Sequence, residues 1–245
     1  MSGHSKWNNI KRKKGASDAQ RAKIFTKVAR EIAVAVREGG PDPTINGKLR
    51  DCIAKAKANN MPNDNIDRTI KKAAGTDNKS EYVEMVYEGY GPCGVAVVVE
   101  ALTDNRNRTA GDLRHYFDKN GGNLGQSGSV AFLFNRKGVL YLDNPDNRLD
   151  EETVLEDCFE AGAEDVDFGD EAIEVLTGTN EVRNARETLE AKGYTITSAQ
   201  PEYLPTTYTA IEDPALAEKM VRLLEMLEDN DDVQNVWHNW EDGEE

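Results

Sequence analysis

The spacing of apolar residues predicts a helical segment at the start of the chain. Before Gly39, apolar side chains recur at helical spacing, at Ile24, Phe25, Val28, Ile32 and Val36. A second helix is predicted over residues 46–60, and a third begins at Asn63 as its cap and is closed by Gly75. The third helix is too short to be stable alone, so the pattern indicates a small three-helix domain.

The pattern changes to that of strands after a polar linker at residues 76–80. Runs rich in valine and tyrosine at 82–88 and 95–102 predict two strands. Asp104 is expected to cap a helix that runs to about Asn120. Residues 130–134 and 139–142 are expected as two further strands around a turn at 135–138.

From Val139 the predicted elements follow the order βαββαβ, which is that of the ferredoxin-like split βαβ unit. A helix opened by Asp213 and Pro214, and a strand at 233–240, then complete the preceding domain. The predicted fold class is therefore α+β and multidomain. Its parts are a basic N-terminal helical domain (1–78), an α+β domain (79–135 plus 205–245) and an inserted ferredoxin-like α+β domain (136–204).

The distribution of charge divides the chain at the same linker. The 245 residues carry a net charge of −15, but residues 1–75 hold 17 Lys+Arg and 7 Asp+Glu, a balance of +10, which leaves −25 for the rest. A dense basic segment attracts phosphate backbones, whereas the acidic body would be repelled by them. We therefore expect a nucleic acid as a partner of the N-terminal segment, and a protein as a possible partner of the acidic body.

The candidate nucleic-acid contacts lie between residues 6 and 30. Turning each helical residue by about 100° places four cations opposite the apolar stripe, Lys23, Lys27, Arg30 and Arg37. Trp7 is a candidate for stacking on a base, with packing on the helices as the alternative. Basic runs are often solvated faces, which is the alternative for the charges. The candidates are Lys6, Trp7, Lys11, Arg12, Lys13, Lys14, Arg21, Lys23, Lys27 and Arg30.

Two polar segments of the body are candidates for a secondary contact. Residues 104–109 open a predicted helix, where free N–H groups and two arginines favour an anion, and residues 121–128 form a glycine-rich loop. Each is also explained as a cap or a turn. The candidate side chains are Asn105, Arg106, Arg108 and Asn123. Residues 89–94 match the spelling G-x-G-x-x-G, but a strand follows them, so a hairpin is expected instead of a dinucleotide site.

The sequence offers no catalytic, cofactor or metal-binding pattern. The three histidines are isolated, and Cys52, Cys93 and Cys158 are widely spaced and are expected as buried thiols. No apolar run approaches the ~20 residues of a membrane span, and the first residues lack the apolar core of a secretory signal. We expect a cytoplasmic, non-enzymatic protein without a cofactor, metal or membrane partner.

Several motifs in one order resemble the YebC/PmpR family, and the resemblance spans nearly the whole chain. They are Gly3-His4-Ser5-Lys6-Trp7, Lys23-Ile24-Phe25-Thr26-Lys27, Tyr87-Glu88-Gly89-Tyr90-Gly91-Pro92, Asp104-Asn105-Arg106-Asn107-Arg108-Thr109 and Gly121-Gly122-Asn123-Leu124-Gly125. The resemblance implies a helical domain followed by two α+β domains, and a DNA-binding transcriptional regulator. The alternatives are a translation factor that binds ribosomal RNA and, from another class, an enzyme that uses clefts between the body domains.

Overall fold

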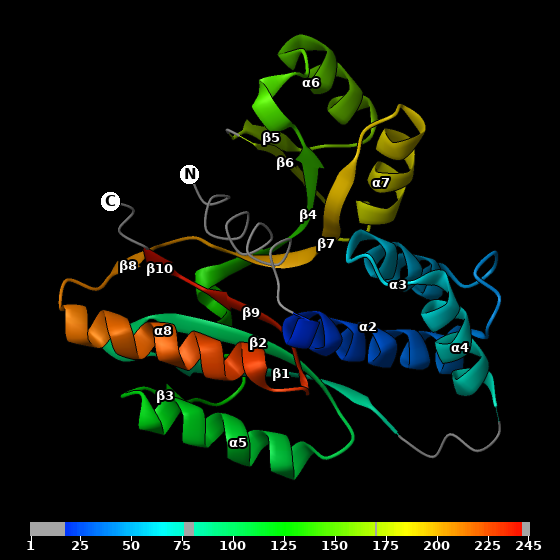
Figure 1. Cartoon of the computed structure of the whole chain (residues 1–245). Helices are drawn as coiled ribbons and strands as arrows, with labels where there is room; N and C mark the ends of the chain where they lie inside the picture. Colours follow the sequence, from blue (N-terminus) through cyan, green and yellow to red (C-terminus); the bar gives the residue numbers. More distant parts are fainter. Residues whose placement is uncertain (1–17, 76–80, 170, 242–245) are drawn as a thin grey trace. The chain divides into compact units, whose positions relative to one another are not determined.

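The computed structural model of the chain describes residues 18–75, 81–169 and 171–241 (Figure 1). Two four-stranded sheets organise these residues, with strand orders β3-β1-β2-β9 and β5-β6-β4-β7. The chain divides into two compact units. One holds Ala22–Ile53, Pro62–Asn135 and the chain from Pro205 onward, and the other holds the described residues up to Arg21, Ala54–Met61 and Arg136–Leu204.

The N-terminal helices are α2 (Asp18–Gly39), α3 (Gly47–Ala58) and α4 (Asn63–Ala74). On α2, Val28, Ile32 and Val36 are buried, as the apolar spacing predicts. Asn46 joins α2 to α3. Its Oδ1 accepts the N–H of Leu49 at 3.0 Å, and its Nδ2 donates to the carbonyls of Ala35 and Gly40 at 2.7 and 2.8 Å. The start of α3 is thereby fixed to the end of α2.

The predicted cap of the third helix is wrong by one residue. Pro62, with φ −60° and ψ 142°, occupies the extended N-cap position of α4, and Asn63 is the first helical residue. The N-cap makes no side-chain hydrogen bond, which a proline cannot offer. Gly75 follows the last helical residue, as predicted, but with φ −71° instead of a left-handed conformation.

The first sheet is antiparallel and packs one face against two helices. Its strands are β1 (Val83–Tyr90), β2 (Ala96–Thr103), β3 (Asn123–Leu124) and β9 (Val233–His238), and the helices are α5 (Arg106–Lys119) and α8 (Pro214–Asp229). In Figure 1, α5 and α8 lie beside this sheet. The core between them is formed by Val95, Val97, Val99, Leu113, Phe117, Met220, Leu223, Leu227 and Val233. Asp213 caps α8 through the N–H of Ala215, and Pro214 is its first residue, as predicted.

The segment spelled G-x-G-x-x-G is a hairpin, as predicted. It joins β1 to β2 through the short 3-10 helix η1 (Pro92–Gly94). A Cβ on Gly89 would lie 2.8 Å from the ring of Phe117, so close packing against α5 requires this glycine. Cys93 lies in this turn with φ 56° and is exposed, so the expectation of a buried thiol is wrong for Cys93 and correct for Cys52 and Cys158.

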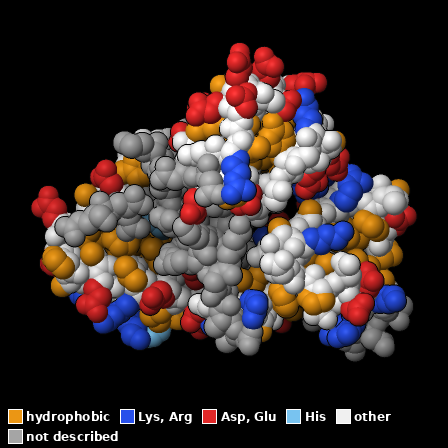
Figure 2. Space-filling view, turned by 45° about the horizontal axis from the view of Figure 1, so that its top comes forward, with side chains coloured by type: hydrophobic (Ala, Val, Ile, Leu, Met, Phe, Trp, Pro, Cys, Tyr) orange, Lys and Arg blue, Asp and Glu red, His pale blue; other side chains and the backbone are white. Residues whose placement is uncertain are grey.

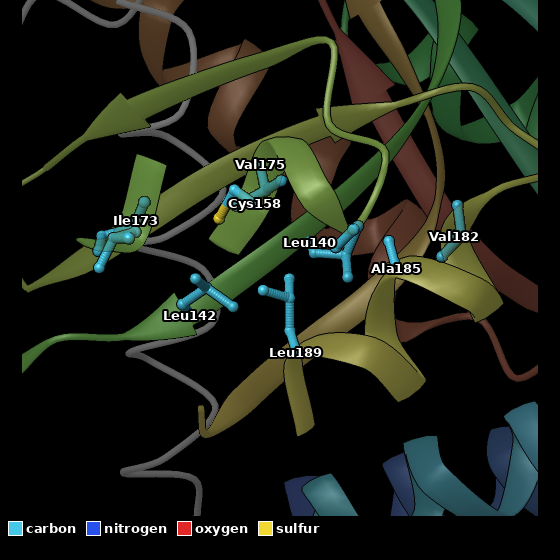
Figure 3. Packing of buried hydrophobic residues seen from close by; sticks show 10 residues of the cluster. Leu140, Leu142, Cys158, Ile173, Val175, Val182, Ala185 and Leu189 are labelled. Carbon is cyan, nitrogen blue, oxygen red and sulfur yellow. The ribbon is translucent and has the colours of Figure 1, made fainter. Parts of the chain in front are cut away.

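The second sheet has the strand order of a ferredoxin-like unit, as predicted. Leu140, Leu142, Ile173 and Val175 point from the sheet toward Cys158, Ala185 and Leu189 of the helices, as Figure 3 shows. These residues form the core of the unit. The elements are β4 (Phe134–Asp143), η3 (Pro145–Asn147), α6 (Glu151–Glu160), β5 (Asp165–Phe168), β6 (Ala172–Thr177), α7 (Val182–Ala191) and β7 (Ile196–Pro205).

The hairpin predicted at 130–142 is wrong. Residues 131–133 form a 3-10 turn, η2 (Ala131–Leu133), and β4 then runs without interruption through the segment 135–138. Gly138 belongs to the turn that the sequence predicts, but close packing explains this glycine instead. A Cβ there would lie 2.3 Å from Thr177 Oγ1 and 2.4 Å from Val182 Cγ2.

A short parallel pair, β8 (Thr209–Ala210) with β10 (Trp240–Glu241), completes the described elements. The helices found within the three described ranges include none that is long and apolar enough to cross a membrane. The domain boundaries expected at 78/79, 135/136 and 204/205 stay a prediction, because the helices α2 and α3 are each divided between the two compact units.

Candidate nucleic-acid interface

The N-terminal arm, residues 2–14, lies outside the described residues. Its candidates Lys6, Trp7 and the basic run 11–14 therefore stay predictions from the sequence. Arg21, on the first turn of α2, is exposed. The described part of the candidate interface therefore begins on α2.

The cationic face of α2, as we call Lys23, Lys27 and Arg30, is turned away from the apolar stripe, as the helical spacing predicts. It contacts what we call the acidic turn, residues 228–232, which comprise the last two residues of α8 and the connection to β9. Lys23 Nζ lies 2.8 Å from Asp229 Oδ1, and Lys27 Nζ donates to the backbone carbonyl of Glu228 at 2.6 Å. The face is thus directed at the end of α8, where acids and free helix carbonyls attract cations.

Arg30 makes the most buried of these contacts. Its Nη1 donates to the carbonyl of Asp231 and to Asp232 Oδ1, each at 2.7 Å, and its guanidinium lies 5.4 Å from the ring centroid of Tyr82. The side chains of Arg30 and Asp232 are 18% and 5% exposed, against 42% and 72% for Lys23 and Asp229. Arg30 is therefore the fixed member of the face, and the Lys23 pair is the solvated one.

Asp232 binds groups from three separate parts of the chain. Its Oδ1 accepts from Arg30, while its Oδ2 accepts from Arg108 Nη2 at 2.7 Å, Thr109 Oγ1 at 2.8 Å and Thr103 Oγ1 at 3.2 Å. Burial disfavours the charged carboxylate, but the hydrogen bonds from Arg108, Thr109 and Arg30 outweigh it, so the pKa of Asp232 is lowered. The carboxylate is therefore ionised at neutral pH.

The start of α5 differs from its predicted cap. Asn105, and not Asp104, is the N-cap, and its Oδ1 accepts the N–H of Arg108 at 3.1 Å. Asp104 instead pairs with Arg108 Nη2 at 2.9 Å. Among the secondary candidates, Asn105 therefore has a structural role and Arg108 is held by two carboxylates, while Arg106 is exposed.

A residue that sequence reasoning missed, Glu88, holds the glycine-rich loop. Its Oε1 accepts the N–H of Gly128 at 2.7 Å, and its Oε2 accepts the N–H groups of Val130 and Ala131 at 2.8 Å each. Burial opposes ionisation, but these three bonds prevail and lower the pKa of Glu88. Its partners are some forty residues away, so no local pattern marks it. The candidate Asn123 is exposed on β3, opposite Tyr90.

Acidic side chains gather over α6, as Figure 2 shows, whereas the described lysines and arginines of α3 and α4 are mixed with other residue types. The acids of α6 that are exposed are Glu151, Glu152, Glu156 and Glu160. Within the three described ranges, no group of three or more His, Cys, Asp or Glu side chains is placed to hold a metal ion.

These features define an α+β multidomain protein with N-terminal helices, of which one presents a cationic face. Residues 5–76 match the domain family described as "TACO1/YebC protein N-terminal domain". Residues 82–240 match the family described as "TACO1/YebC second and third domain". The chain belongs to the TACO1/YebC family, which confirms the resemblance derived from the motifs.

The relatives extend over the whole chain. A protein of Ruminiclostridium cellulolyticum named "probable transcriptional regulatory protein" is 58% identical over 245 residues, covering 100% of this chain and 98% of its own. A Geobacillus kaustophilus protein of the same description is 51% identical, covering 98% and 97%. The crystal structure of a conserved hypothetical protein from Aquifex aeolicus is similar with a TM-score of 0.83, at 48% identity over 93% of both chains.

Proposed function

We propose that this chain is a non-enzymatic, cytoplasmic regulator of gene expression that binds nucleic acid, with DNA as its first target. The observation that carries the proposal is the balance of +10 in residues 1–75 of a chain whose net charge is −15. Such a segment binds phosphates while the acidic remainder is kept away from them. The printed names of the relatives, probable transcriptional regulatory proteins, support regulation of transcription.

The arm is the primary contact in this proposal. The cationic face of α2 is engaged by the acidic turn, so the first phosphates are bound by cations that precede α2. Trp7 adds a surface on which an unpaired base can stack. The proposed arm contacts are Lys6, Trp7, Lys11, Arg12, Lys13 and Lys14.

The body contributes position instead of affinity. Arg106 is exposed at the N-terminus of α5, and a single cation in an acidic surround positions a backbone more than it anchors it. The acidic side chains of α6 repel phosphate and suit a basic protein surface. A protein partner of the body is therefore part of the proposal.

Substitution of the arm cations tests the proposal. A variant with Lys6, Lys11, Arg12, Lys13 and Lys14 changed to Gln should melt as the wild type does and lose most of its binding in gel shifts. Five lost phosphate contacts should flatten the slope of log affinity against log salt by up to about 4.5 units on B-form DNA. The control changes Arg68, Lys71 and Lys72, which are exposed on α4, to Gln. An unchanged gel shift of the arm variant contradicts the proposal.

Ribosomal RNA is the alternative target, which the family resemblance leaves open. Sedimentation of lysate on a sucrose gradient, after treatment with DNase or with RNase, separates the two targets. Co-migration with ribosomes that only RNase abolishes would replace DNA by ribosomal RNA. Release by DNase alone supports DNA.

A further inference from the structure

The acidic turn presents to α2 the same chemistry that a nucleic-acid backbone would. Carboxylate oxygens of Asp229 and Asp232 and carbonyl oxygens of Glu228 and Asp231 accept the hydrogen bonds of Lys23, Lys27 and Arg30. We infer that the acidic turn is an internal competitor of nucleic acid. When a phosphate backbone binds, it displaces residues 228–232 from the cationic face. This inference rests on the proposed function and concerns the regulation of the same interface.

The best-formed part of this internal ligand is Asp232. Arg30 and Arg108 donate to its two oxygens, and Thr103 and Thr109 add hydroxyl hydrogen bonds. Two guanidinium groups and two hydroxyls around one anion form a donor set that also suits a phosphate group. A phosphate that replaces the carboxylate would therefore keep Arg30 and Arg108 paired, although the two arginines lie on different helices, α2 and α5.

The contacts differ in how readily they exchange with solvent and ligand. The Lys23–Asp229 pair is exposed, and exposed ion pairs are weak and screened by salt. In the contact of Lys27 with the turn, the acceptor is a backbone carbonyl and not a carboxylate. The Arg30–Asp232 pair is buried and must be replaced by an equivalent anion. Displacement therefore starts at Lys23 and is completed at Arg30.

The competition has a consequence for selectivity. A ligand must supply several closely spaced anions before it replaces the contacts of all three cations. Long nucleic acids satisfy this condition, because each strand carries a negative charge at about every 3.4 Å of axis, and single nucleotides do not. The acidic turn therefore raises the threshold for binding at the cationic face of α2.

Asp229→Asn tests the inference, because it removes one carboxylate from the exposed end of the contact. In gel shifts at low salt the variant should bind about 3- to 10-fold more tightly, with a salt slope steeper by up to about 1 unit. Glu212→Gln is the control, since it removes one exposed acid of the same compact unit away from the turn. Lys23→Gln added to Asp229→Asn should cancel the gain. An equal gain from Glu212→Gln and Asp229→Asn overturns the inference.

Hydrogen–deuterium exchange gives a second readout on the wild-type protein. The amide of Asp232 donates to Asn230 Oδ1, and that of Val233 to the carbonyl of Asn230. Saturating duplex DNA should speed exchange at both amides, while a mononucleotide should not. Unchanged or slower exchange with bound DNA would reject the displacement of the acidic turn and leave the proposed function in place. Failure of the wild type to bind any nucleic acid would instead reject the proposed function on which the inference rests.

Discussion

Arg30 donates from Nη1 to Asp232 Oδ1 over 2.7 Å, although 202 residues of sequence separate the two. The pair fixes α2 to the turn between α8 and β9 within one compact unit. A position that helical spacing predicts as a solvated phosphate contact is therefore also part of the structure. Substitution of Arg30 should therefore affect stability as well as nucleic-acid binding.

Arg30→Gln should lower the free energy of unfolding more than Lys23→Gln or Lys27→Gln. The first change leaves a buried carboxylate with fewer donors and should cost about 1–3 kcal/mol. The lysine changes affect exposed contacts and should each cost under about 1 kcal/mol. Urea unfolding of the three single variants measures the order. Equal losses at all three positions would contradict the distinction drawn from burial.

The ionisation of Asp232 should contribute to the pH dependence of the stability of the chain. Its pKa is lowered in the folded chain, so its ionised form contributes stability above the unfolded value near 3.8. That contribution is lost as the pH falls through the lowered folded pKa. Asp232→Asn should therefore lower the melting temperature at pH 7 and flatten its decline between about pH 5 and pH 2. Glu212→Gln serves as the control, and a variant that keeps the full acid decline would refute the assignment.

The cap of α5 can be tested by two adjacent substitutions. Asn105→Ala removes the acceptor of the Arg108 N–H and should cost about 0.5–2 kcal/mol. Asp104→Ala removes only an exposed ion pair and should cost less, under about 1 kcal/mol. Thermal unfolding of both variants compares them. A larger loss for Asp104→Ala would restore Asp104 as the cap.

Two glycines should respond to alanine in opposite directions. At Gly138 the new Cβ meets Thr177 Oγ1 at 2.3 Å, so Gly138→Ala should destabilise the chain by about 1–3 kcal/mol. At Gly111, inside α5, a Cβ meets nothing within 4 Å, so Gly111→Ala should stabilise by about 0.5–1 kcal/mol. Denaturant midpoints measure both. A neutral Gly138→Ala would contradict the close packing at this position.

The sequence is most informative where structure depends on local spacing. Helical periodicity finds α2 through Val28 and Ile32, and the order of elements after Val139 identifies the ferredoxin-like unit, because both are local patterns. Local pattern is misleading at Gly138, because the sequence does not distinguish a glycine required by close packing from one required by a turn.

Contacts between distant residues leave no trace in local patterns. A sequence that shows Arg30 as a cation does not show that the acid of residue 232 lies opposite it, nor that Glu88 gathers the N–H groups of residues 128–131. The candidate interface is therefore predicted as a set of charges and not as a set of partners. The arm lies outside the described residues, so its contacts stay a prediction from the sequence.

The passage of the chain out of one compact unit and back has a consequence for how the protein can be altered. The chain leaves after Asn135 and returns at Pro205, and the flanking residues Leu133 and Thr206 are hydrogen-bonded, with Thr206 N donating to the Leu133 carbonyl at 2.8 Å. The compact unit that the chain leaves and re-enters, here called the host unit, is therefore held together by a backbone hydrogen bond beside the point where residues 136–204 depart. Because these two stems are hydrogen-bonded neighbours, we expect a variant that lacks residues 136–204 to keep the ends of the host unit together.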